Sequence, residues 1–555
     1  MTDHDRTPTR FTRRQTILAG AGSVTAAIVA GSTGRAAAEP PHGATDPTDG
    51  TAGEPGRFDR TTLWSRGEEG WVDFRVHAVD ATPAGTILAF SEARFGTSAD
   101  DGPKDLVLRR SVDGGATWGP TTYLERHDGG GWANPTPVID RRTGRITVWY
   151  AWNDRGRTSK VFRRTSTDDG VSWSEAEELT HLFADNPVGW TFHLPGPGRG
   201  IQLADGRLLV EVWHRRSIEV PAAERDYTAS VVASDDGGRT WSWGGIVPDR
   251  AGLGLNEARI AALATGEVIL NSRLGGGPSN TSRAVSRSSD GGRTFSEVVI
   301  ETNIAPHAGI TSGFAARVDR TGLERVVYTS PVAGTERRTI YARISYDGAE
   351  SWSWGRVVDE ARAGYSDIVW LDDSTLLLLY SRLGASGAET LDVVAAWFDL
   401  GWLTEGRDQV GPGPVGLRGQ HQVEGLRSES TVPRAPMIID PAAAGSAVAH
   451  VPAAVPGDTH RVTVVPAGSG RRRLRCRFRA PEPCLGAELT IKVDGRRRGG
   501  PVATSTGDPY LEVDLGTIMV RAGRPVRIEF VVRGPAAGGA AFQVDAVSLL
   551  PPGTS

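Results

Sequence analysis

One eight-residue phrase, repeated five times, limits the folds that this chain can adopt. The serines that begin the copies are 55, 68, 54 and 57 residues apart. A period of about 50 residues with one turn phrase in each unit is typical of radial repeats such as β-propellers. The copies read SVDGGATW, STDDGVSW, SDDGGRTW, SSDGGRTF and SYDGAESW and begin at Ser111, Ser166, Ser234, Ser288 and Ser345.

Each phrase has the chemistry of a tight hairpin turn. The aspartate, Asp113 in the first copy, can accept hydrogen bonds from backbone N–H groups of the turn. The glycine, Gly115 in that copy, permits a positive φ, and the final Trp or Phe gives a large apolar anchor. Ala349 takes the glycine position in the fifth copy, so we expect that turn to be distorted or strained. One Asp and one Ser per turn are too few ligands for a calcium cage, and we expect no metal and no cofactor.

Short runs of β-forming residues surround every copy and favour antiparallel strands. Residues 57–402, at about 57 residues per unit, predict a six-bladed propeller in which one blade lacks the phrase. A strand near residues 61–64 should pair with residues 393–398, since closing the ring removes exposed sheet edges. The clearest runs are residues 106–108, 146–150, 268–270 and 376–380.

The start of the chain has the pattern of an export signal. Arg13 and Arg14 precede an apolar run over residues 17–31, and three alanines end the segment at Ala38. This resembles a twin-arginine signal peptide of residues 1–38, followed by a flexible linker of residues 39–56. The apolar run is too short for a membrane span. We therefore expect an exported protein. We also expect a monomer, and the net charge of −4 gives no reason to expect nucleic acid as a partner.

After a linker predicted for residues 403–430, residues 431–555 predict a small β-sandwich. It loosely resembles the carbohydrate-binding modules of secreted glycosidases. Cys476 and Cys484 could form one local disulfide. Arginines alternate with apolar residues over residues 473–479, which indicates either one solvated strand face or a patch for anionic glycans. The predicted strands are residues 461–465, 474–478, 489–493, 511–515, 526–532 and 542–550.

Several phrases, in the same order along residues 65–402, resemble those of the retaining exo-sialidases, which are six-bladed propellers. The phrases NPTP at residues 134–137 and GPGRGIQL at residues 196–203 are also usual in that family. The other phrases are DFRVHAV with Arg75, AFSEARFGTSADDGPKD with Arg94 and Asp100, NEARIAALATGEVILNSR with Glu257 and Arg273, TERRTIYARISYDG with Arg337, and AGYSDIVWL with Tyr365.

The resemblance implies release of terminal sialic acid from glycans, with sialylated glycoproteins, glycolipids or oligosaccharides as partners. It implies Tyr365 as nucleophile, Glu257 as its base and Asp100 as acid/base, with Asp101 as the near alternative to Asp100. It implies a carboxylate-binding triad and one further binding arginine. The triad is Arg75, Arg273 and Arg337, and the further residue is Arg94.

Elementary chemistry agrees with these roles. Three guanidinium groups can hold the sugar carboxylate by charge-assisted hydrogen bonds. A neutral phenol is not repelled by that carboxylate as a carboxylate nucleophile would be, and sialidases are the known tyrosine exception among glycosidases. Because a free tyrosine has a pKa of about 10, Tyr365 needs a base, and the arginines should favour its phenolate.

Two departures from the family pattern leave the substrate open. Val76 and His77 follow Arg75 where the family has Ile-Pro, and Ser381 stands where the family usually has a glutamate that orients the first arginine. We expect His77 to be either a packing residue or a residue that supports the site side chains from behind. A related 2-keto-3-deoxy sugar acid, a propeller that binds sialylated glycans without turnover, and a protein-binding propeller remain as alternatives.

Overall fold

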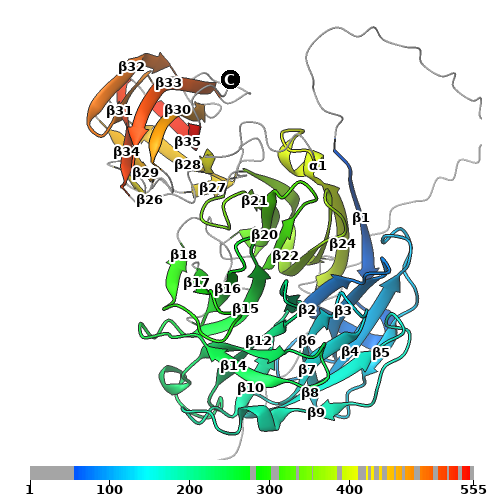
Figure 1. Cartoon of the computed structure of the whole chain (residues 1–555). Helices are drawn as coiled ribbons and strands as arrows, with labels where there is room; N and C mark the ends of the chain where they lie inside the picture. The colour runs from blue at the N-terminus through cyan, green and yellow to red at the C-terminus, as the bar shows by residue number, and fades with distance from the viewer. Residues whose placement is uncertain are drawn as a thin grey trace, which may run out of the picture. The chain divides into compact units, whose positions relative to one another are not determined.

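The computed structural model is almost entirely β-sheet (Figure 1). It describes residues 56–275, 283–301, 312–332, 337–352, 354–383 and 391–410 of the repeat region. In the C-terminal region it describes residues 420–422, 427–430, 437–439, 447–454, 458–464, 469–479, 488–503, 511–521, 524–534 and 540–550. The predicted export signal and almost all of the linker after it lie outside these ranges, which contain no helix long and apolar enough to cross a membrane.

The first sheet contains two four-stranded antiparallel blades. Blade 1 pairs β2, β3, β4 and β5 in order, and blade 2 pairs β6, β7, β8 and β9. The strands are β2 (Trp71–Ala81), β3 (Ile87–Phe95), β4 (Lys104–Ser111), β5 (Thr122–Glu125), β6 (Gly131–Ile139), β7 (Ile146–Asp154), β8 (Thr158–Ser166) and β9 (Glu177–Glu178). The runs predicted at residues 106–108 and 146–150 lie within β4 and β7.

Blades 3 and 4 form separate sheets. In blade 3 the inner edge is divided between β10 (Phe192–Pro195) and β11 (Ile201–Gln202), which both pair with β12 (Leu208–Arg215). This blade continues with β13 (Thr228–Ser234) and β14 (Ser242–Ile246). Blade 4 consists of β15 (Leu255–Ala262), β16 (Val268–Leu274), β17 (Arg283–Ser288) and β18 (Val299–Glu301).

Blades 5 and 6 share one long strand, β22 (Trp354–Trp370). Its first half is the outer strand of blade 5, and its second half is the inner strand of blade 6. Blade 5 also contains β19 (Gly313–Val318), β20 (Glu324–Val332) and β21 (Arg338–Ser345), and blade 6 contains β23 (Thr375–Leu383) and β24 (Leu391–Asp399). Single-turn 3-10 segments lie at Glu68–Gly70, Thr180–Phe183 and Ala222–Glu224.

The outer strand of blade 6 comes from the start of the repeat region. Strand β1 (Phe58–Trp64) pairs antiparallel with β24, so that Thr61 lies opposite Ala395 and Trp64 opposite Val393. This is the ring closure predicted from the sequence. One buried apolar cluster fills each of the six interfaces between neighbouring blades, including the interface between blades 6 and 1. The predicted six-bladed propeller is therefore confirmed.

The repeated phrase forms the turn between the third and fourth strands of blades 1 to 5. In every copy the serine hydroxyl donates to the aspartate carboxylate at 2.7–2.8 Å and accepts the N–H four residues on at 2.8–3.0 Å. Ala349 keeps this hydrogen bond at a φ of 65°. Because a side chain disfavours positive φ, the fifth turn is strained but not distorted.

The final aromatic of each phrase packs between its own blade and the blade before it. The five side chains are Trp118, Trp173, Trp241, Phe295 and Trp352. Blade 6 has no such phrase, and the short helix α1 (Leu400–Thr404) supplies the missing anchor. Trp402 of α1 packs against the cluster between blades 5 and 6 and stacks on Phe58 with ring centroids 4.6 Å apart.

A buried ion-pair cluster fastens the segment after α1 to blade 5. Arg325 on β20 lies 2.6 Å from Asp408 and 2.6 Å from Asp319. All three side chains are at most 2% exposed, and Tyr346 of the fifth turn also donates to Asp408 at 2.9 Å. Together with Trp402, this cluster holds the chain at the one interface that lacks a turn phrase.

The C-terminal region forms two sheets around a single core. One sheet orders β27 (Met437–Ile439), β28 (Ala447–Ala454), β35 (Ala540–Leu550), β30 (Gly470–Arg479) and β33 (Leu511–Val520), with β25 (Gln420–Gln422) also paired to β35. The other sheet orders β26 (Arg427–Ser430), β29 (Thr459–Val464), β34 (Val526–Gly534), β31 (Glu488–Val493) and β32 (Arg496–Ala503). Apolar residues from both sheets share one buried cluster, which confirms the predicted sandwich.

Three details of this region refine the predictions. The short strands β25 and β26 lie within the range predicted as a linker. Cys476 is a buried free thiol, and Cys484 lies outside the described residues. In the arginine strip, Arg473 pairs with Asp514, and Arg475 lies 2.9 Å from Glu512 on the neighbouring strand. These pairs favour a solvated strand face over a glycan patch.

Replacing Asp408 by alanine should destabilise the propeller. Arg325 would lose a carboxylate partner at a buried position, and the breaking of a buried pair costs on the order of 3 kcal/mol or more. Urea unfolding of Asp408→Ala and wild type measures the difference. The matched control is Glu178→Ala, because the Glu178–Lys160 pair is solvent-exposed and should contribute about 1 kcal/mol at most. Equal midpoints for the two variants would contradict the assigned role of the cluster.

Candidate active site

The predicted site residues meet at one end of the channel between the inner strands. The inner and third strands of each blade run the same way, and the second strand runs against them. The starts of inner and third strands and the ends of second strands therefore share one end of the propeller. Arg75, Glu257 and Tyr365 lie on β2, β15 and β22, Arg94 and Arg273 lie near the ends of β3 and β16, and Arg337 precedes β21.

Four inner strands carry a β-bulge at this level. On β2, residues 76–77 lie opposite the single residue Ser91, and on β22, residues 364–365 lie opposite Ser381. Corresponding bulges occur at residues 134–135 of β6 and 256–257 of β15. A bulge changes the direction of its side chains and is common beside active sites. Glu257 and Tyr365 both lie on these bulges.

Tyr365, Glu257 and Arg273 form a hydrogen-bonded chain across two blades. The Tyr365 hydroxyl donates to Glu257 Oε1 at 2.7 Å. Glu257 Oε2 accepts from Arg273 Nη1 at 2.7 Å. The Glu257 side chain is 9% exposed, so both interactions act where screening by water is weak. The structure thus brings the predicted nucleophile within reach of the predicted base.

Tyr365 is a neutral phenol in this arrangement. Burial, and then the negative charge of Glu257, raise the pKa of Tyr365 above its usual value. Arg273 and Arg337 act in the opposite direction, as we expected, but do not outweigh them. The phenol can therefore attack an electrophile only as its proton passes to Glu257.

The remaining triad arginines lie close enough to this cluster to act on its charges. Burial lowers the pKa of Arg337, and the nearby charges of Arg273 and Arg75 lower it further, whereas Tyr365 and Glu257 raise it. Three guanidinium groups thus act on one another at the mouth of the channel. Like charges this close are costly without an anion between them, so the arrangement suits a bound carboxylate.

Asp100 lies on a loop at the edge of the cluster. Its carboxylate is 2.7 Å from Arg94 Nη1 and its side chain is 85% exposed. Loss of some hydration opposes ionisation, but Arg94, with Lys104 and Arg75, lowers the pKa of Asp100 below its usual value. Asp100 is therefore ionised and paired with the predicted binding arginine in this state. Asp101 has no hydrogen bond or ion pair with the described residues.

The buried carboxylate of Glu92 pairs with Arg94. Glu92 is 1% exposed, with its carboxylate 3.3 Å from Arg94 and 3.4 Å from Lys104. Glu92 also accepts the N–H of Asn134 at 3.0 Å, which ties blade 1 to the bulge of blade 2. Neither Glu92 nor Lys104 was predicted from the sequence. The spacing of Glu92 and Arg94 could have indicated the pair, since residues i and i+2 share one face of a strand.

The two departures from the family pattern meet in the structure. His77 is fully buried, and its Nε2 lies 2.7 Å from the Ser381 hydroxyl. Its Nδ1 lies 3.0 Å from the Ser91 hydroxyl. Burial, and then Arg259, lower the pKa of His77 to about 3, so the imidazole is neutral. His77 therefore links the serines that face the bulges of β2 and β22, which agrees with the supporting role, the second of the two roles that we predicted.

Arg75 has an orienting carboxylate that the sequence prediction missed. Its Nε donates to Asp73 Oδ2 at 2.8 Å, and the Asp73 side chain is 1% exposed. Asp73 is two residues earlier on the same strand face. The Asp73 carboxylate thus orients Arg75, which is the role that the family pattern gives to a glutamate at position 381.

These blades and turns define a repeat propeller with a polar cluster at one end of its channel. A family model described as "BNR repeat-like domain" matches residues 85–378, which is more than half of the 555-residue chain. The chain therefore belongs to the BNR repeat-like domain family.

Proteins with sequences similar to this chain include sialidases. The chain is 28% identical to a sialidase of Micromonospora viridifaciens over 373 residues, which cover 63% of this chain and 55% of that protein. It is 28% identical to a sialidase of Bacteroides fragilis over 347 residues, covering 57% and 61%. The chain thus spans less than two thirds of the length of both relatives. The predicted resemblance to the sialidase family is confirmed.

The fold also matches solved structures. The chain superposes on the structure titled "Hadza microbial sialidase Hz136" with a TM-score of 0.53 and 24% identity, covering 62% of this chain and 69% of that one. A match at 24% identity supports the fold alone.

Replacing Glu257 by glutamine should lower the pKa of Tyr365. The negative charge of Glu257 is the second largest cause that raises this pKa, and its removal leaves Arg273 and Arg337 to favour the phenolate. Titration of protein labelled with 13C at tyrosine Cζ, with Tyr365→Phe to assign the signal, measures the change by NMR. Glu267→Gln is the matched control, because Glu267 pairs with Arg287 in the same blade at 2.7 Å. An unchanged or higher Tyr365 pKa in Glu257→Gln would contradict the assigned contact.

Proposed function

We propose that the protein is an exported exo-α-sialidase that hydrolyses terminal sialic acid from glycoconjugates. The reaction proceeds with retention of configuration through a tyrosyl-enzyme intermediate. The observation that carries the proposal is the hydrogen bond of 2.7 Å from the Tyr365 hydroxyl to Glu257. A buried phenol paired with a carboxylate base is the arrangement that nucleophilic attack by tyrosine requires.

The arginine cluster supports a substrate with a carboxylate at the reacting carbon. Arg75, Arg273 and Arg337 supply charge-assisted donors that can hold this group. Because the sugar carboxylate lies beside the anomeric carbon, an ionised nucleophile would be repelled, whereas the neutral Tyr365 is not. As the phenol attacks, its proton passes to Glu257, and Arg273 stabilises the charge on that pair.

Asp100 is the proposed acid and base for the leaving sugar. In the first step it donates a proton to the glycosidic oxygen, and in the second it activates water. It is ionised in the free protein because of Arg94. The carboxylate of an incoming sialoside adds a negative charge at the site, which raises the pKa of a neighbouring acid. Substrate binding therefore favours the protonated form that the first step needs.

The departures at positions 76, 77 and 381 support a second candidate within the same chemistry. Arg75 is held by Asp73, and Ser381 is engaged by His77. The orientation of Arg75 thus depends on different neighbours from those of the family pattern. A glycoside of a related 2-keto-3-deoxy sugar acid is the alternative substrate, and a propeller that binds sialylated glycans without turnover is the non-catalytic alternative.

Export and the partners of the protein are parts of the same proposal. The twin arginines and the apolar run before Ala38 support passage through a membrane, after which sialylated glycoproteins, glycolipids or oligosaccharides are accessible. We propose that the protein acts as a monomer and without nucleic acid.

Hydrolysis of a fluorogenic sialoside tests this function. Wild type should release the fluorophore, and Tyr365→Phe should lose activity by a factor on the order of 10³ or more, as expected for a nucleophile. Phe keeps the volume of the ring, so the cost in packing is small. Tyr328→Phe is the matched control, because this buried tyrosine contacts Ser312 outside the proposed site, and it should keep activity within a few-fold.

The same assay separates the alternatives. Turnover of a deaminated or eight-carbon analogue, but not of the sialoside, would assign the related sugar acid. No turnover of any of these by wild type, with retained glycan binding, would identify a binding propeller and overturn the proposed activity.

A further inference from the structure

The channel between the inner strands has a second end, far from the tyrosine cluster. Asp80 lies five positions after Arg75 along β2, and Trp370 lies five positions after Tyr365 along β22. At about 3.3 Å per residue, the second end lies roughly 16 Å from the tyrosine cluster. We call this end the far mouth and define it by the residues of the cavity that it contains.

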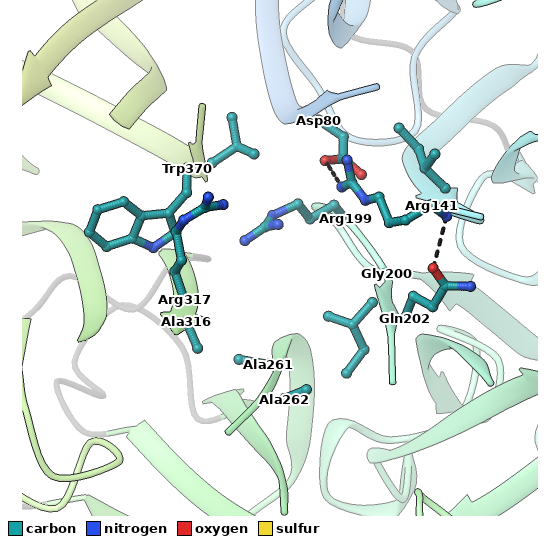
Figure 2. Close-up of a pocket in the computed structure, with 13 residues that line it drawn as sticks. Asp80, Arg141, Arg199, Gly200, Gln202, Ala261, Ala262, Ala316, Arg317 and Trp370 are labelled. Atoms are coloured by element: carbon teal, nitrogen blue, oxygen red, sulfur yellow. Dashed lines mark hydrogen bonds and ion pairs between the residues drawn. The ribbon is translucent and has the colours of Figure 1, made fainter. Parts of the chain in front are cut away.

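A cavity of about 360 Å³ occupies the far mouth (Figure 2). Every blade contributes to its lining, and blade 4 contributes small side chains that leave the space open. One lining residue from each blade, in order from blade 1 to blade 6, is Asp80, Arg141, Arg199, Ala262, Arg317 and Trp370. Figure 2 shows the Arg199 side chain extending into the space between Asp80 and Trp370.

The lining carries more positive than negative charge. Arg141 is paired with Asp80 at 2.6 Å, and Arg317 is paired with Asp373 at 2.6 Å. Arg199, in contrast, forms no hydrogen bond or ion pair with any residue in the described part of the chain. Its Nε is buried without a partner, and burying a charged donor without an acceptor is costly.

Two acids, Asp367 and Glu211, lie deeper in the channel, and the charge of Arg199 acts to lower the pKa of both, but neither forms a hydrogen bond or ion pair with it among the described residues. Asp367 is fully buried, and its carboxylate accepts the N–H groups of Val79 and Ile368. Burial raises the pKa of Glu211 to about 8, so this acid is largely neutral at pH 7. Arg259 lies 3.8 Å from Asp367. The charge of Arg199 is thus not neutralised by direct contact.

The backbone before and after Arg199 fixes its place at the rim. Gly198 has a φ of 112°, and a Cβ there would lie 1.6 Å from Arg259 Nη1. The Gly200 N–H donates to the carbonyl of Pro137 at 2.8 Å. The phrase GPGRGIQL, which the tyrosine cluster does not use, therefore places a guanidinium group in the far mouth.

We propose that the far mouth is a binding site for a small oxyanion, with Arg199 as the main ligand-binding residue. A guanidinium group donates two parallel hydrogen bonds to a sulfate, phosphate or carboxylate group. Arg141 and Arg317 are each paired with a carboxylate, so Arg199 supplies the net positive charge at the rim. The cavity volume is at the small end of the range for ligand sites. The occupant is a small organic or inorganic anion and not a glycan chain.

Selenate, a sulfate analogue that scatters anomalously, tests this site directly. Crystals of the full chain soaked in selenate should show an anomalous peak within hydrogen-bond distance of Arg199. The peak should be absent in Arg199→Gln, weaker in Arg199→Lys, and unchanged in Arg250→Gln. Arg250 is 89% exposed and does not line the cavity, so this variant controls for the loss of one positive charge.

Calorimetric titration with sulfate gives the matching result in solution. Sulfate held by the arginines of the tyrosine cluster is common to all variants, so the comparison isolates the far mouth. Arg199→Gln should remove one binding event or weaken it at least tenfold, and Arg250→Gln should change it less than twofold. Phosphate and acetate are then tested as competitors of sulfate. Displacement of sulfate by either one supports the site, and the stronger competitor shows whether the site prefers a phosphate or a carboxylate group. A wild-type crystal with selenate elsewhere but none at Arg199 would overturn the proposal.

Discussion

The antiparallel pairing of β1 with β24 is the interaction on which the rest of the structure depends. It brings the start of the repeat region, at Phe58, opposite its last strand, at Phe398, and so completes the sixth blade. Once the ring is closed, every inner strand starts at the same end of the channel. Residues that are far apart in the sequence then meet there, as Tyr365 and Glu257 do. The other ends of the same strands converge on the far mouth.

Much of the fold could be predicted because its signals are local. The hydrogen bonds of each turn phrase lie within eight residues, and the apolar runs beside the phrases form strands in any blade. Phe58 and Trp402 were not predicted as the anchor of the sixth interface, because no repeated phrase marks them. The strands β25 and β26 were also missed, since Gln420–Gln422 and Arg427–Ser430 have no apolar alternation. Their pairing depends on partners far along the chain.

The tyrosine, its base and the arginines of the candidate site could be named from the sequence, but the carboxylates of Asp73 and Glu92 that hold the arginines, and the geometry of the site, could not. A bulge depends on the register between two strands, and a single strand carries no signal for it. The bulges at residues 256–257 and 364–365 are nevertheless what place Glu257 and Tyr365 in contact. Similarly, His77 and Ser381 looked like two unrelated departures from the family pattern, but they form one buried hydrogen bond. The pairing of Asp100 with Arg94 could not be predicted either, because it depends on the conformation of the loop that carries Asp100.

The measurement that tests the central claim most directly is the chemical trapping of the intermediate. A 3-fluoro sialosyl fluoride should react with the wild-type enzyme and stop there, because fluorine beside the anomeric carbon destabilises the oxocarbenium-like transition state of the second step. Mass spectrometry of the digested protein should place the added sugar on the peptide that contains Tyr365. A label on Glu257 or Asp100, or an active enzyme that forms no adduct and releases an inverted product, would contradict the tyrosine mechanism.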